Sequence, residues 1–101
     1  KGFSFWRPRI EANQAIARLR LGELDVGPVL ERAAAYCREN SEGFQLARCL
    51  EGLAELALAR GDAAGCIAYA EELLALVEPG GLKELAARAR RWRELGSEHL
   101  P

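Results

Sequence analysis

The chain has 101 residues, of which 50% are hydrophobic, 7% aromatic and 29% charged, and its formal net charge at pH 7 is −1. This balance is typical of a soluble globular protein. A near-neutral chain has no overall field that would attract nucleic acid or an anionic membrane, so we expect neither as a partner. No stretch approaches the roughly 18 apolar residues of a membrane span.

Alanine and leucine dominate the chain, and apolar residues recur every three or four positions without a useful alternation of period two. This pattern predicts an all-α protein. Connections of about two to five residues make successive helices antiparallel. Five helices are expected, at about residues 8–21, 26–39, 43–60, 63–77 and 82–95.

The first two predicted helices form a hairpin. Pro8 suits the first turn of the helix at 8–21, and Gly22 is expected to end it. Asp25 is the expected N-cap of the helix at 26–39, which carries one apolar face. The first helix instead carries two narrow apolar stripes, Ala12/Ala15/Ile16/Leu19 and Ile10/Ala17/Leu21.

The third predicted helix, at 43–60, has an unusually wide apolar face. At 100° per residue, its apolar side chains from Phe44 to Leu58 cover an arc of roughly 200°. Gln45, Gly52 and three charged residues fill the remaining arc. A helix packed on one neighbour needs about half that apolar width. We therefore expect this helix to have neighbours on two sides.

The last two predicted helices follow with clear start and stop signals. Asp62 is the expected N-cap of the helix at 63–77, and Pro79-Gly80-Gly81 should stop that helix. The helix at 82–95 is expected to end at Gly96, with the residues beyond it frayed.

Three glycines follow the ends of predicted helices at intervals of 39 and 35 residues. Seven residues before each glycine stands an alanine, and small residues at fixed points let antiparallel helices approach closely. Such self-similarity is typical of stacked helix–turn–helix repeats, which bind partners rather than catalyse reactions. The glycines are Gly22, Gly61 and Gly96, and the alanines are Ala15, Ala54 and Ala89.

The segment from Leu50 to Pro79 resembles the tetratricopeptide repeat family through Leu50, Leu53, Ala54, Gly61-Asp62, Cys66, Ala70, Leu73 and Pro79. The resemblance implies a superhelix of antiparallel helix hairpins. Residues 1–101 would then be a single domain of two repeats plus a C-terminal capping helix. Glu11, Arg18 and Arg88 depart from the family by standing where its members are apolar. Because the chain starts without methionine, we expect it to be a piece of a longer protein.

Four segments also read like the C-terminal repeat region of large bacterial signalling ATPases, a class that includes LuxR-type activators and cyclase-linked proteins. That resemblance implies a cytoplasmic sensor or scaffold in signal transduction or transcriptional regulation, and it carries over no catalytic residue. The expected function is non-enzymatic protein–protein interaction. The alternative is a small self-associating helical domain that oligomerises a larger protein. The segments are Phe5–Pro8, Ala15–Gly22, Ala35–Glu39 and Gly52–Asp62.

Tetratricopeptide arrays usually receive ligands in a concave groove lined by the first helix of each repeat. The resemblance therefore implies a groove for a protein or peptide segment, another domain of the same chain included. The alternative for these positions is an ordinary solvated surface. The residues implied are Arg9, Ala12, Asn13, Ile16, Arg48, Glu51, Glu55, Leu58, Ala86, Arg90 and Arg93.

Cations surround Trp92 in the last predicted helix. One interpretation is a nucleic-acid or phosphate site with a stacking aromatic ring. The other is a solvated face held by ion pairs one turn apart, Glu84 with Arg88 and Arg90 with Glu94. The slightly negative net charge favours the solvated face. The remaining cations of this cluster are Lys83, Arg91 and Arg93.

Phe3, Phe5 and Trp6 place three aromatic residues within four positions. They either fold onto the first two helices or belong to a contact with an upstream repeat that this chain lacks, in which case they form an exposed patch that tends to self-associate. In the second case we expect a homodimer that becomes monomeric when Phe5 and Trp6 are replaced by serine.

No motif for catalysis or cofactor binding occurs in the chain. Cys37, Cys49 and Cys66 lack metal-ligand spacing and the only histidine is His99, so we expect reduced core thiols and no metal site. Glu71-Glu72 is expected to be a solvated pair, because adjacent helix positions point apart and no base accompanies them. We therefore expect no enzyme activity and no cofactor.

Overall fold

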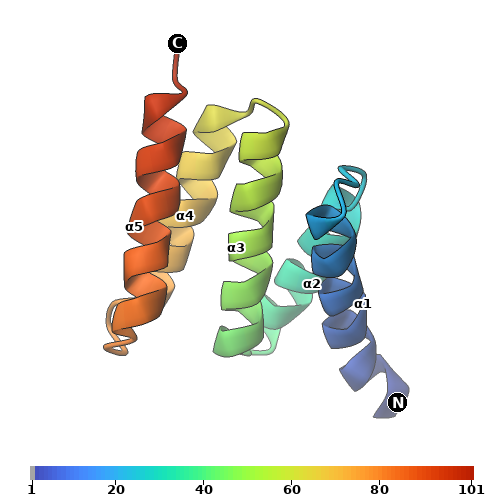
Figure 1. Ribbon diagram of the computed structural model, residues 1–101. Coiled ribbons are helices and arrows are strands. Elements are labelled where there is room, and N and C mark those ends of the chain that lie inside the picture. The colour runs from blue at the N-terminus through green and yellow to red at the C-terminus, as the bar shows by residue number, and fades with distance from the viewer. Residues whose placement is uncertain (1) are drawn as a thin grey trace.

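The structure is a computed structural model that describes the backbone of residues 2–101 and the side chains of residues 7–101 (Figure 1). Within this range the chain forms helices and no strand, which confirms the all-α prediction. The five helices are α1 (Gly2–Arg20), α2 (Gly27–Glu39), α3 (Gly43–Ala59), α4 (Ala63–Val77) and α5 (Lys83–Glu98).

The helices form two layers. Successive helices are antiparallel, so α1, α3 and α5 run in one direction, and α2 and α4 run in the other (Figure 1). In the described chain α3 contacts both α1 and α5, whereas the backbones of α2 and α4 stay apart. The molecule measures 46 × 32 × 18 Å, and its short dimension accommodates two helices of about 10 Å diameter. The predicted antiparallel hairpins are therefore confirmed.

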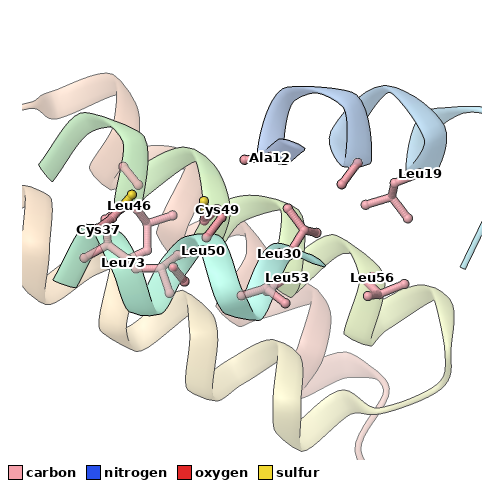
Figure 2. Packing of buried hydrophobic residues seen from close by; sticks show 14 of the residues in the cluster. Ala12, Leu19, Leu30, Cys37, Leu46, Cys49, Leu50, Leu53, Leu56 and Leu73 are labelled. Atoms are coloured by element: carbon pink, nitrogen blue, oxygen red, sulfur yellow. The ribbon is translucent and has the colours of Figure 1, made fainter. Parts of the chain in front are cut away.

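The central helix, α3, contacts each of the other four helices. This confirms the prediction that it has neighbours on more than one side. Its long leucine side chains pack with residues of α1, α2 and α4 in one buried cluster (Figure 2). The buried apolar residues of α3 are Leu46, Ala47, Cys49, Leu50, Leu53, Ala54, Leu56 and Ala57.

Three residues of α3 differ from their predicted exposure. Gln45 and Gly52 were expected on the polar arc, yet both are buried, because α1 packs on that side of the helix. A Cβ atom at Gly52 would lie 3.4 Å from Ile16 Cγ1, so the missing side chain lets the two helices approach. Phe44 was expected on the apolar face, yet it is 72% exposed, because it stands at the rim of an open pocket.

Each connection between helices contains one residue with φ in the left-handed region, and the chain reverses its direction there. Gly22 and Gly61 do so, as predicted from their positions after apolar helices. Gly81 and Ser41 take the same role in the other two connections. In each case the N–H of the residue after the left-handed one donates to the carbonyl five residues earlier. This hydrogen bond satisfies a carbonyl in the last turn of the helix that would otherwise lack a donor. These donor–acceptor pairs are Glu23–Arg18, Glu42–Cys37, Asp62–Ala57 and Leu82–Val77.

The prediction that Gly96 ends the fifth helix is wrong. This glycine is buried within α5, which continues to Glu98. A Cβ atom at Gly96 would lie 2.7 Å from Ile67 Cγ1 and 3.1 Å from the carbonyl oxygen of Ala63. Gly96 is therefore a packing position at which α5 approaches α4, and residues that were expected to fray extend the helix instead.

The helix starts are confirmed in one case and corrected in two. Asp62 caps α4 as predicted, since its Oδ1 accepts a hydrogen bond from the Gly65 N–H at 2.9 Å. Asp25 does not cap α2; Val26 precedes the helix, and Asp25 instead accepts from Arg18 Nη2 at 3.0 Å. The helix α1 begins at Gly2, so Pro8 lies inside it and leaves one intrahelical hydrogen bond unmade.

The small residues that mark the repeat are core positions. Ala15, Ala54 and Ala89 are 2%, 0% and 0% exposed, so the same position of α1, α3 and α5 is buried. Cys66 and Gly27, which follow the glycines at equal distance, are buried as well. Burial of a small residue therefore recurs at these positions, although Ala15 and Ala89 belong to the main core cluster and Ala54 and Cys66 to the second one.

Candidate functional site

The helices α1, α3 and α5 share a groove with a volume of about 170 Å³, which we call the α1/α3/α5 groove. Residues at intervals of three and four positions lie one above another on a helix, so α3 contributes a ladder of four side-chain positions. The groove is lined by Ile16 and Arg20 of α1, Arg48, Glu51, Gly52 and Glu55 of α3, and Arg88 of α5.

The floor of the groove exists because α1 and α3 cross at a glycine. A Cβ atom at Gly52 would lie 3.4 Å from Leu30 Cδ1, in addition to its contact with Ile16. A single added carbon would just make van der Waals contact with these two side chains, whereas a longer side chain would extend into the space between α1 and α3. The apolar surface of Ile16 thus remains available between charged walls.

Glu51 is the best-bonded residue of the groove. Arg88 donates to it through Nε at 2.9 Å and through Nη2 at 3.1 Å, and Trp92 Nε1 donates at 3.1 Å. The hydrogen bond to Glu51 raises the pKa of Arg88 above its ordinary value. A planar guanidinium and a carboxylate paired in this way hold a fixed relative orientation. The pair therefore joins α3 to α5 along the groove.

The other charged residues of the groove have no ion-pair partner. Among the described residues, Arg20, Arg48 and Glu55 take part in no side-chain hydrogen bond or ion pair. Three arginines against two glutamates leave the groove with an excess of one positive charge. The free groups lie on α1 and on two turns of α3, so a ligand that carries both charge signs can pair with them.

The structure brings together four of the eleven groove residues expected from the sequence. Ile16, Arg48, Glu51 and Glu55 all line the same groove. Three further lining residues were missed: Arg20, Gly52 and Arg88. Arg20 is four positions after Ile16, and Gly52 is four positions after Arg48, so helical spacing alone could have added both.

The remaining expected groove residues lie elsewhere for several reasons. Ala12 and Ala86 are 0% and 4% exposed and belong to the core. Arg9 donates to Glu42 at 2.7 Å. Leu58 packs against a second small core cluster.

Arg90, Asn13 and Arg93 do not line the groove either. Arg90 donates to Glu78 at 3.0 Å, which directs it toward the end of α4. Asn13 is exposed on α1, and Arg93 is half-buried on α5. The aromatic cluster Phe3, Phe5 and Trp6 has side chains outside the described residues, so its predicted role in self-association stays a prediction.

The expected ion pairs around Trp92 are wrong. Arg88 pairs with Glu51 rather than Glu84, and Arg90 pairs with Glu78 rather than Glu94. Helix-to-helix partners replace partners one turn away, because α3 and the end of α4 lie beside α5. The Trp92 ring packs on the small core cluster of Ala54, Ala57 and Cys66, and its N–H is bonded to Glu51.

The opposite layer is joined by two polar bridges between α2 and α4. Arg38 donates to both carboxylate oxygens of Glu72, at 2.8 and 2.9 Å. The Tyr69 hydroxyl donates to Glu31 at 2.5 Å. Burial, together with this hydrogen bond, raises the pKa of Tyr69 to about 12. The bridges close the gap between two helices whose backbones do not touch.

The three cysteines are free and buried, as predicted. Burial raises the pKa of all three thiols, that of Cys49 to about 12. Cys37 and Cys49 lie in the core among leucine side chains (Figure 2). A thiol that stays protonated and covered is a poor nucleophile and a poor metal ligand.

The free energy of unfolding is expected to fall as the pH rises above about 9. In the unfolded chain a thiol and a phenol ionise at 9.0 and 10.0, whereas Cys49 and Tyr69 ionise near 12 in the folded protein. The folded state therefore holds these protons more tightly than the unfolded state. The resulting contribution to the free energy of unfolding is fully present below pH 9 and is lost as the pH rises towards 12. Urea denaturation at a series of pH values measures this.

Replacing Tyr69 with phenylalanine should flatten the decline between about pH 10 and pH 12, because the shifted phenol is gone. Tyr36→Phe removes a hydroxyl elsewhere on α2 and serves as the matched control. An unchanged pH profile in Tyr69→Phe would contradict the assignment.

The chain matches no family model, no curated protein and no solved structure. In the described residues, no group of three or more His, Cys, Asp and Glu side chains is placed to hold a metal ion. None of the described helices combines the length and the hydropathy that crossing a membrane requires. The α1/α3/α5 groove is therefore the feature from which a function is inferred.

Proposed function

We propose that the chain is a tetratricopeptide-like interaction segment that binds a partner protein along the α1/α3/α5 groove and carries out no catalysis itself. The observation that carries this proposal is the convergence of three parallel helices on one charged groove with an apolar floor. Stacked helix hairpins generally use such shared faces to bind extended or helical segments. The parent protein would be a cytoplasmic bacterial signalling or regulatory protein, as the sequence resemblance suggests.

The free charges of the groove define the chemistry of the partner segment. Arg20 and Arg48 favour an acidic residue, and Glu55 favours a basic residue. Arg48 and Glu55 are seven residues apart on one helix, a separation of about 10.5 Å along its axis. An extended segment spans this distance in about three residues. We therefore propose a partner segment with an acidic and a basic residue about three positions apart.

The charge reversal Arg48→Glu tests the proposal. A phage-displayed library of random peptides is selected on the wild-type chain, and the affinity of the enriched peptides is measured by isothermal titration calorimetry. We expect Arg48→Glu to weaken binding by at least about tenfold, since a charge-assisted contact becomes a repulsion. Exchanging the acidic residue of the peptide for lysine should restore binding to Arg48→Glu.

Arg32→Glu is the matched control. Arg32 is exposed on α2, in the opposite layer, and has no ion-pair partner among the described residues. Its reversal changes the net charge equally but leaves the groove intact. The proposal fails if Arg32→Glu weakens binding as much as Arg48→Glu, or if selected peptides bind both variants like the wild type.

A further inference from the structure

An apolar patch lies at the end of the molecule that carries the α2–α3 and α4–α5 connections (Figure 1). Its most prominent member is Phe44, which is 72% exposed, and Leu82 beside it is 37% exposed. The patch surrounds a cavity of about 170 Å³. We call it the Phe44 patch; it consists of Gly43, Phe44, Ala47, Leu76, Val77 and Leu82.

The cavity has the size and character of a site for one aromatic ring. An apolar cavity of about 150 Å³ is large enough to bind benzene. The pocket here is partly open to solvent, has a volume of about 170 Å³, and is lined by aliphatic side chains together with Phe44 itself. The ring of Phe44 belongs to the same patch and is largely exposed to water. The patch therefore presents both a projecting ring and a cavity that fits one.

A two-fold interface requires this combination, because the same patch must supply both contacts. Two copies that face each other across a two-fold axis can each place the Phe44 ring in the cavity of the other.

The charges around the patch permit this approach. Glu42 is paired with Arg9, and Glu78 is paired with Arg90. Lys83 and Glu84 are exposed beside Leu82 and have opposite signs. The rim thus has no excess of one charge that would repel a second copy, and Lys83 of one copy is complementary to Glu84 of the other.

We propose that the chain forms a weak two-fold dimer through the Phe44 patch, with each Phe44 ring in the cavity of the second copy. The patch has six residues, far fewer than the roughly 20–30 residues a side of a standard interface. The dimer therefore forms at high concentration and dissociates on dilution. This surface is separate from the α1/α3/α5 groove, so the proposal stands or falls independently of the proposed function.

Sedimentation velocity over a micromolar-to-millimolar concentration series tests the dimer. The wild type should rise from the monomer mass towards twice that mass, and Phe44→Ser should stay monomeric throughout. Phe44→Ser is expected to fold, because the side chain it removes is exposed. Leu21→Ser is the matched control, since Leu21 is 80% exposed beyond the end of α1; it should dimerise like the wild type.

Three outcomes would overturn the proposal. They are a wild type that is monomeric at every concentration, a Phe44→Ser variant that still dimerises, and a dimer that responds to Phe5→Ser and Trp6→Ser instead.

Discussion

Replacing Gly96 with valine is expected to lower the free energy of unfolding by about 2–3 kcal/mol, the upper part of the range for overpacked cores. The first added atom would lie 2.7 Å from Ile67 Cγ1 and 3.1 Å from the backbone oxygen of Ala63. The backbone contact cannot be relieved by a change of rotamer, so α5 must shift away from α4. Urea denaturation followed by circular dichroism measures the loss.

Two variants control for the other effects of this substitution. Ala87→Val places valine on the exposed side of α5. It should lower the free energy of unfolding only by the difference in helix propensity between alanine and valine, about 0.6 kcal/mol. Gly96→Ala adds a single carbon, and its better helix propensity partly offsets the contact. We expect Gly96→Ala to lie between Ala87→Val and Gly96→Val. A Gly96→Val variant as stable as Ala87→Val would show that α4 and α5 do not meet at Gly96.

Leu50→Ala is expected to lower the free energy of unfolding by about 3 kcal/mol, within the range for leucine truncations that leave a cavity. Leu50 is 0% exposed at the centre of α3, and it packs in the cluster that joins α3 to the other helices. Figure 2 shows its side chain among those of α2, α3 and α4. Since α3 contacts every other helix, the surroundings cannot collapse onto the cavity without moving several elements.

Leu21→Ala makes the same chemical change at a position that is 80% exposed. Its expected effect is within about 0.5 kcal/mol, as for most surface substitutions. At about 4–8 °C per kcal/mol in a domain of this size, Leu50→Ala should also lower the midpoint of thermal unfolding by more than roughly 10 °C. Equal stabilities of the two variants would contradict the central place of α3 in the core.

The architecture could be predicted because its signals are local. A left-handed reversal without strain needs a glycine, and Gly22 and Gly61 stand directly after apolar helical runs. The capping of α4 by Asp62 follows from side-chain chemistry within three residues. The width of the apolar arc of α3 reflects the number of helices that pack on it. The sequence of this one helix therefore predicts a tertiary property.

Other features depend on neighbours that one segment does not reveal. Gly96 carries the same sequence signal as Gly22 and Gly61, but the surface of α4 beside it decides that it is a packing residue. Phe44 is apolar and in phase with the core, yet no helix covers it. In a two-layer fold the position of such residues depends on where adjacent helices end.

In the candidate site, too, some features follow from local sequence spacing and others depend on the neighbouring helices. Ile16, Arg48, Glu51 and Glu55 share a groove, and helical spacing alone places Arg48, Glu51 and Glu55 on one face of α3. The pairing of Glu51 with Arg88 and Trp92 joins residues 37 and 41 positions apart. Local spacing predicts the pair Glu84 with Arg88 instead, because it contains no information about which helix lies opposite.

Amide chemical-shift mapping by NMR is the most direct test of the α1/α3/α5 groove as the binding surface. The isotope-labelled chain is titrated with a peptide selected on it. We predict that the largest shifts occur at Ile16, Arg48, Gly52 and Glu55, with the amides of α2 and of the Phe44 patch unchanged. Shifts confined to α2, α4 or the Phe44 patch, with the groove amides unmoved, would contradict the proposed binding surface.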